Sequence, residues 1–79
     1  MANTKSVMVL VRDKIVYIDL GEILKQGRLS IDDIKGNTVY KAEIADSHYE
    51  VIILDQPRGK YWVNITSDSL KTKKSFHIK

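Results

Sequence analysis

The chain has 79 residues, a net charge of +3 at pH 7 and no cysteine. This length suits one small domain (1–79), and the lack of cysteine excludes a disulfide framework and favours a reducing compartment. The only early apolar run, residues 7–11, is too short for a membrane span and is followed at once by charged residues. These features predict a cytoplasmic protein that does not contact a membrane.

Two strands are predicted near the start of the chain. Residues 1–4 are expected to be disordered. Residues 6–11 are apolar at both odd and even positions, so both faces of the segment are apolar, which is typical of a central or doubly covered strand. Residues 15–20 form a second apolar run. Arg12-Asp13-Lys14 between the runs predicts a short turn.

The hydrophobic period changes after the second strand. Leu20, Ile23 and Leu24 have helical spacing, Asp19 precedes them as an N-cap, and Gly27 is placed to end the helix. A second capping pattern starts at Ser30, with Asp33 three residues later, and stops at Gly36. The pattern therefore predicts one or two short helices that lie on the sheet.

Residues 38–44 predict a third strand and residues 45–48 a turn. Residues 49–66 then predict a central hairpin, because two β-branched and aromatic runs flank Gln56-Pro57-Arg58-Gly59. The expected register sets Ile53 opposite Trp62. Both faces of this hairpin would be apolar, so the helices or a partner would have to cover one of them.

The end of the chain is basic. Lys71, Lys73, Lys74 and Lys79 lie within the last nine residues, and no acid lies among them. Either the whole segment 70–79 is a strand that docks Phe76 and Ile78, or residues 71–75 form a flexible basic loop.

Together these elements predict an α+β domain dominated by an antiparallel sheet of five or six strands, with one or two short helices between the second and third strands. The sheet either stays open or curls into a small, partly open barrel of SH3 or OB size. The curled form is favoured because so many strands are apolar on both parities.

No catalytic constellation is visible. His48 and His77 lack metal-ligand spacing, the glycines are isolated rather than gathered in a phosphate-binding loop, and the serines lack a nearby base in sequence. We therefore predict a binding module that is not an enzyme and has no metal or cofactor.

Basic and aromatic residues of the hairpin and the C-terminal segment form the candidate site. Aromatic rings beside cations suit base stacking and phosphate contact, so nucleic acid, either DNA or RNA, is the first predicted partner. This interpretation requires Lys71 and Lys73 to lie near the hairpin cations. The predicted site residues are Arg58, Lys60, Tyr61, Trp62, Tyr49, Lys71, Lys73 and Lys74.

An alternative is a protein-interaction module, either a regulator or inhibitor of a larger protein or a homodimer. It would use one apolar sheet face made of Val51, Ile53 and Trp62. In the plainest interpretation, Trp62 and Tyr61 are core residues on opposite faces and Arg58 is an ordinary turn residue.

Overall fold

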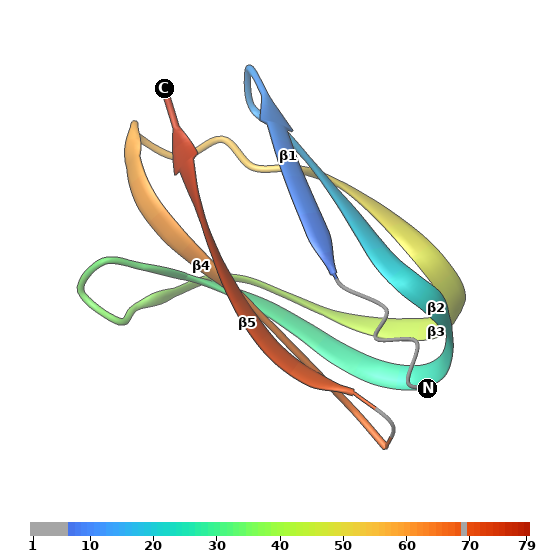
Figure 1. The fold of residues 1–79 in the computed structure, drawn as a ribbon. Helices are drawn as coiled ribbons and strands as arrows, with labels where there is room; N and C mark the ends of the chain where they lie inside the picture. The colour runs from blue at the N-terminus through green and yellow to red at the C-terminus, as the bar shows by residue number, and fades with distance from the viewer. Residues whose placement is uncertain (1–6, 69) are drawn as a thin grey trace, which may run out of the picture.

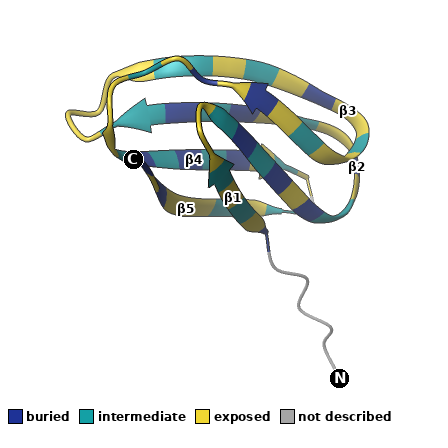
Figure 2. Cartoon of the chain, turned by 90° about the horizontal axis from the view of Figure 1, so that it is seen from above, coloured by how far each residue is buried: buried dark blue, intermediate teal, exposed yellow. Residues whose placement is uncertain are grey.

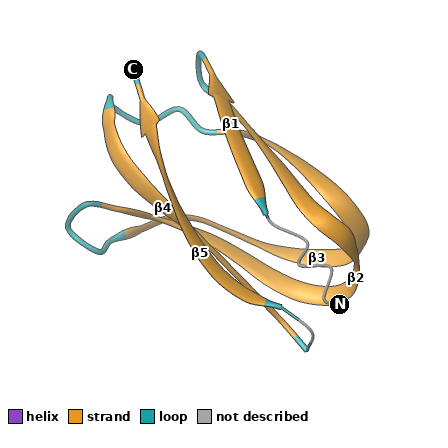
Figure 3. Cartoon of the chain, viewed as in Figure 1, coloured by secondary structure: helices purple, strands orange, loops and turns teal. Residues whose placement is uncertain are grey.

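A computed structural model describes residues 7–68 and 70–79. These residues contain strands and connecting loops but no helix (Figure 3), so the predicted α+β class is wrong and the described fold is all-β. The predicted disorder of residues 1–4 lies outside the described residues. The strands are β1 (Met8–Arg12), β2 (Ile15–Asp33), β3 (Thr38–Ile53), β4 (Gly59–Ser67) and β5 (Lys71–Ile78).

The strands form one antiparallel sheet that folds over into two layers (Figure 1). Layer A contains β1, residues 15–19 of β2 and residues 49–53 of β3. Layer B contains residues 26–33 of β2, residues 38–45 of β3, β4 and β5. The long strands β2 and β3 therefore run through both layers, and the antiparallel, curled sheet expected from the sequence is present.

The first predicted helix is a bend in β2. The Asp19 Oδ1 atom accepts a hydrogen bond of 2.9 Å from the backbone N–H of Gly21, which has a φ of 80°. Glycine adopts this left-handed conformation without a steric penalty, and the strand register shifts between Asp19 and Leu24. An acidic residue that looked like a helix cap thus holds a strand bend.

The second predicted helix is the end of β2 and the turn after it. Leu29 and Ile31 are buried on one side of β2, while Ser30 between them points to the other side. Asp33 Oδ1 accepts backbone N–H bonds from Lys35 and Asn37, each 2.9 Å long. A carboxylate that accepts hydrogen bonds from nearby N–H groups stabilises a turn as readily as the start of a helix. The capping pattern therefore did not distinguish a helix from a turn.

The predicted turn at residues 45–48 lies inside β3, which bends there around Asp46 with a φ of 49°. The predicted central hairpin is also wrong. β3 does not pair with β4, because residues 54–58 cross from layer A to layer B and β4 pairs with β2 and β5. The crossing begins at Leu54, which is buried and donates its N–H to the Lys14 carbonyl at 2.7 Å.

The C-terminal segment is a full strand, β5, rather than a loop with a short strand after it. Phe76 and Ile78 are buried, while Lys73 and His77 on the other parity are exposed. The alternation of polar and apolar residues in this segment therefore matches a strand whose apolar side lies in the core.

One core lies between the two layers, and buried bands alternate with exposed bands along the strands (Figure 2). Each layer contributes the side chains of one parity to this core. The outer sides of the two layers remain for contact with other molecules. The buried residues are Val7, Val16, Ile18, Leu20, Leu24, Leu29, Ile31, Ile44, Ile52, Leu54, Tyr61, Val63, Ile65, Phe76 and Ile78.

Candidate functional site

The outer side of layer B gathers basic side chains from four strands. The residues that alternate with the buried ones on β2, β3, β4 and β5 share this side, as the strand register requires. We call this surface the cationic face. Its basic residues are Arg28, Lys41, Lys60, Lys71 and Lys73.

Trp62 is the aromatic centre of the cationic face. The side chain is half-buried, and two ammonium groups lie over its ring. The Lys60 Nζ is 4.8 Å and the Lys73 Nζ 5.0 Å from the ring centroid. A cation over an indole is attracted by the negative face of the ring, so both lysines are held close to Trp62.

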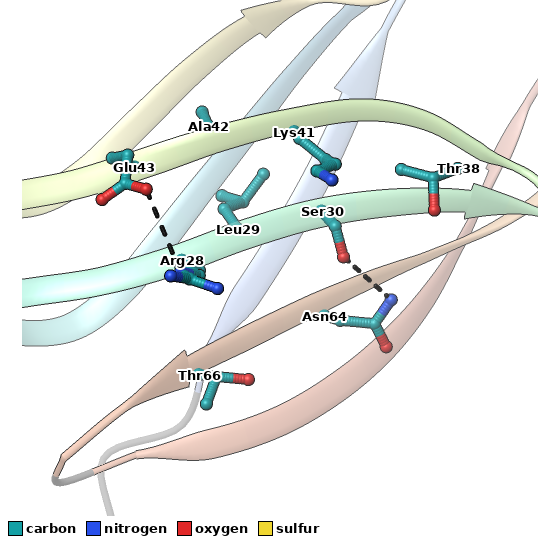
Figure 4. Close-up of a pocket in the computed structure, with 9 residues that line it drawn as sticks. All are labelled: Arg28, Leu29, Ser30, Thr38, Lys41, Ala42, Glu43, Asn64 and Thr66. Atoms are coloured by element: carbon teal, nitrogen blue, oxygen red, sulfur yellow. Dashed lines mark hydrogen bonds and ion pairs between the residues drawn. The ribbon is translucent and has the colours of Figure 1, made fainter.

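A shallow depression of about 680 Å³ adjoins this centre (Figure 4). Asn64 donates from Nδ2 to Asp32 Oδ2 at 3.0 Å and to Ser30 Oγ at 3.4 Å. Asp32 also accepts a bond of 2.9 Å from the Thr38 hydroxyl, which links the three neighbouring strands β3, β2 and β4. The lining residues are Arg28, Leu29, Ser30, Thr38, Lys41, Ala42, Glu43, Asn64 and Thr66.

The cationic face keeps an excess of positive charge. Its five cations lie with two carboxylates, Asp32 and Glu43, which leaves a net charge of +3. The Arg28 Nε lies 3.9 Å from Glu43 Oε2, and both side chains are more than four-fifths exposed. Solvent screens such an exposed pair, so it neither rigidifies the face strongly nor removes its attraction for anions.

The structure brings together four of the predicted site residues and separates the others. Lys60, Trp62, Lys71 and Lys73 share the cationic face. Tyr61 instead points into the core, where its ring stacks on Phe76 at 5.8 Å, so its ring is not available for stacking on a ligand. Its hydroxyl donates to the Pro57 carbonyl at 2.6 Å.

The remaining three predicted residues lie elsewhere. Lys74 pairs with the buried Val63 and is therefore on the opposite side of β5 from Lys73. Tyr49 is on the outer side of layer A. Arg58 lies in the crossing segment, beside a smaller depression of about 310 Å³.

The predicted single apolar face of Val51, Ile53 and Trp62 does not exist. Val51 and Ile53 point outward from layer A, whereas Trp62 points outward from layer B. The error follows from the hairpin prediction, which paired β3 with β4.

Sequence reasoning missed Arg28 and Ser30 because the segment 20–36 was predicted to form short helices. It missed Lys41, which was expected in a strand, because the pairing of that strand with β2 was not predicted. The signal that could have found the first two is the strict alternation in residues 28–32, where polar residues flank the apolar Leu29 and Ile31.

Within residues 7–68 and 70–79, no polar or charged residue is buried, and no cluster of three His, Cys, Asp or Glu side chains could hold a metal ion. Over the same ranges, no helix is long and apolar enough to cross a membrane. The expectation that the protein is not an enzyme stays a prediction.

Comparison with a solved structure identifies the fold. The crystal structure of a DUF3244 family protein from Bacteroides vulgatus, described as an immunoglobulin-like β-sandwich, superimposes with a TM-score of 0.76. The two sequences are 24% identical, and the match covers 90% of this chain and 81% of that chain. At this identity the similarity concerns the fold alone. No curated protein matches the sequence.

Comparison with protein families identifies the sequence. The family described as "Secretion system C-terminal sorting domain" matches residues 12–79, which is most of the chain. This match overturns the predicted nucleic-acid-binding function and the alternative of a cytoplasmic regulator. It also overturns the cytoplasmic location, since a sorting domain of a secretion system accompanies a protein that leaves the cytoplasm. The chain belongs to the family of secretion system C-terminal sorting domains.

Proposed function

We propose that the domain marks a protein for export by presenting the cationic face to an acidic surface of the secretion machinery. A sorting domain has to be bound by a component of the system that exports it.

The observation that carries the proposal is the arrangement of Lys60 and Lys73 over Trp62. Tryptophan and arginine are the residues that most often dominate the binding energy of protein interfaces. The cationic face has one of each, since Arg28 borders the depression next to the tryptophan strand. Trp62 is half-buried, so part of its ring is in contact with the domain before a partner binds.

The charge of the face indicates the charge of the partner. Five cations against two carboxylates create a positive surface that attracts acidic groups and speeds their association. The hydrogen bonds of Asn64 and Asp32 tie β2 to its neighbours, so the surface is formed in advance and little ordering is needed on binding.

Charge reversal within the cationic face tests this proposal. The domain is fused to the C-terminal end of a reporter protein in cells with the cognate secretion system, and the exported and retained fractions of the reporter are measured. Lys60→Glu combined with Lys73→Glu should lower the exported fraction several-fold, because both cations near Trp62 become repulsive toward an acidic partner.

A matched control uses cations outside the cationic face. Lys35 lies exposed in the turn after β2, and Lys25 lies exposed in the bend of the same strand. The double variant of Lys25→Glu and Lys35→Glu makes the same change in net charge and should be exported normally. Equal export of the two double variants, both folded by circular dichroism, would refute the proposal.

A further inference from the structure

The outer side of layer A is apolar and exposed, in contrast to the cationic face. Five large hydrophobic side chains of β1 and β3 are between 45% and 77% exposed there. We call this surface the apolar face. These residues are Met8, Leu10, Tyr49, Val51 and Ile53.

The strand register arranges the apolar face in three rows that cross β1, β2 and β3 in that order. The first row contains Arg12, Ile15 and Ile53; the second contains Leu10, Tyr17 and Val51; and the third contains Met8, Asp19 and Tyr49. Seven of these nine positions are apolar or aromatic. A patch of this kind is comparable to the largest apolar patch of a typical soluble monomer, and such a patch is often an interaction surface.

We infer that the apolar face packs against the apolar face of a second copy of this chain, related to the first by a two-fold axis. The inference concerns the opposite side of the domain from the cationic face and does not depend on the proposed function.

Arg12 and Asp19 are the only charged residues in the three rows, and they lie in opposite end rows on neighbouring strands. A two-fold axis that runs across the strands places the first row of one copy over the third row of the other. Arg12 then lies over β1 of the second copy, one strand away from the second copy's Asp19. Neighbouring strands are about 4.8 Å apart and packed sheets about 10 Å apart, so an arginine side chain can reach this carboxylate.

The other face-to-face arrangement, with the axis along the strands, is less favourable. It would place Asp19 over Asp19 of the second copy, where two carboxylates repel each other without a cation between them. The charges of the apolar face therefore select one of the two arrangements.

The area of the patch suits a weak dimer. Five side chains exposed to this extent present on the order of 500 Å² of apolar surface in each copy. Two copies together would then bury about 1,000 Å², which is at the lower limit for a specific interface. The dimer should consequently form at high protein concentration and dissociate on dilution.

Sedimentation equilibrium of the full chain provides the first test. The weight-average mass should be close to the 9.1 kDa of the monomer at micromolar concentration and approach twice that value toward millimolar concentration. Ile53→Asp should abolish the increase, and Arg12→Glu should weaken association about tenfold or more. Lys73→Glu, on the cationic face, should leave it unchanged.

Cross-linking tests the arrangement itself. The chain has no cysteine, so single cysteines can be placed on the apolar face without a background reaction. The two-fold axis passes near the second row, where Leu10 faces Leu10 of the second copy, whereas the two Ile53 residues are two rows apart, about 14 Å along the strands. A short bifunctional thiol reagent should therefore join Leu10→Cys chains and leave Ile53→Cys chains largely unjoined.

The outcomes separate this inference from its alternatives. A chain that stays monomeric at every concentration overturns it. A dimer that survives Ile53→Asp overturns it by showing that another surface is used. Cross-linking of Ile53→Cys in preference to Leu10→Cys overturns the proposed axis and hence the role of Arg12 and Asp19.

Discussion

Replacing Gly27 with alanine would test how closely β2 approaches β4 at the start of layer B. A Cβ atom added at Gly27 would lie 2.9 Å from the backbone oxygen of Thr66 and 3.2 Å from the Cβ of Ser67, whereas ordinary contacts are 3.4–4 Å. The first of these neighbours is backbone, so β4 would have to move by several tenths of an ångström. Overpacking of this kind costs about 1–3 kcal/mol.

An opposing effect has to be subtracted. Alanine restricts the unfolded chain more than glycine does, which stabilises a protein by about 0.4–1 kcal/mol where the folded conformation permits it. The net loss at Gly27 should be about 1–2 kcal/mol. For a domain of this size that loss lowers the melting temperature by about 5–15 °C.

Urea unfolding followed by the fluorescence of the single tryptophan, Trp62, would measure the loss. Ala42→Gly provides the reverse control, because Ala42 is half-buried on the neighbouring strand and Gly27 lies on the central one. Removing that methyl group should destabilise the protein by about 0.5–1 kcal/mol. If Gly27→Ala instead makes the protein more stable, the close approach of β2 and β4 is not as described.

Three further predictions concern the core, the β2–β3 turn and an exposed ion pair. Ile31 is completely buried, so Ile31→Ala should cost about 2–5 kcal/mol in urea unfolding, and Ile31→Val only about 0.5–1.5 kcal/mol. The hydrogen bond from the backbone N–H of Asn37 is the main cause that lowers the pKa of Asp33. The ionised Asp33 carboxylate therefore contributes to stability above about pH 4, and this contribution is lost as the pH falls through the pKa of Asp33 in the folded protein. Carboxyl NMR titration should place the Asp33 midpoint below that of an unstructured aspartate, and Asp33→Asn should flatten the stability profile in this acidic range. The hydrogen bond from Lys14 lowers the pKa of Asp55, yet the pair is exposed to solvent, so Lys14→Ala should leave the urea midpoint nearly unchanged.

The strands that could be predicted are those whose local pattern has one interpretation. Residues 8–11 and 38–44 are extended as expected. Of the two alternatives left open for residues 70–79, the structure shows the full strand, with Phe76 and Ile78 on its buried side. The helices were wrong because Asp19 and Asp33 bond to backbone N–H groups two to four residues later, which a strand bend and a turn need as much as a helix does. Gly21 then permits a conformation that a helix would not use.

The candidate site could be predicted only in part for a related reason. The hypothesis required Lys71 and Lys73 to lie near Arg58 and Lys60. In the structure Lys73 and Lys60 both lie over the Trp62 ring, whereas Arg58 lies beside a different depression. The pairing of β4 with β2 instead of β3 joins residues more than thirty positions apart, such as Ser30 and Asn64. No local sequence pattern shows whether β4 pairs with β2 or with β3. The pairing depends on how all the strands are arranged so that their apolar sides are covered.

The sharing of β2 by both layers has a consequence for how the protein loses its structure. Residues 15–19 of this strand bond to one layer and residues 27–33 to the other, so neither layer keeps its central strand if β2 detaches. Amide hydrogen exchange should therefore reveal one cooperative unit, in which the slowest amides at both ends of β2 exchange with the same opening free energy. A cell that must thread such a chain through a narrow opening would meet a single barrier to unfolding rather than two smaller ones.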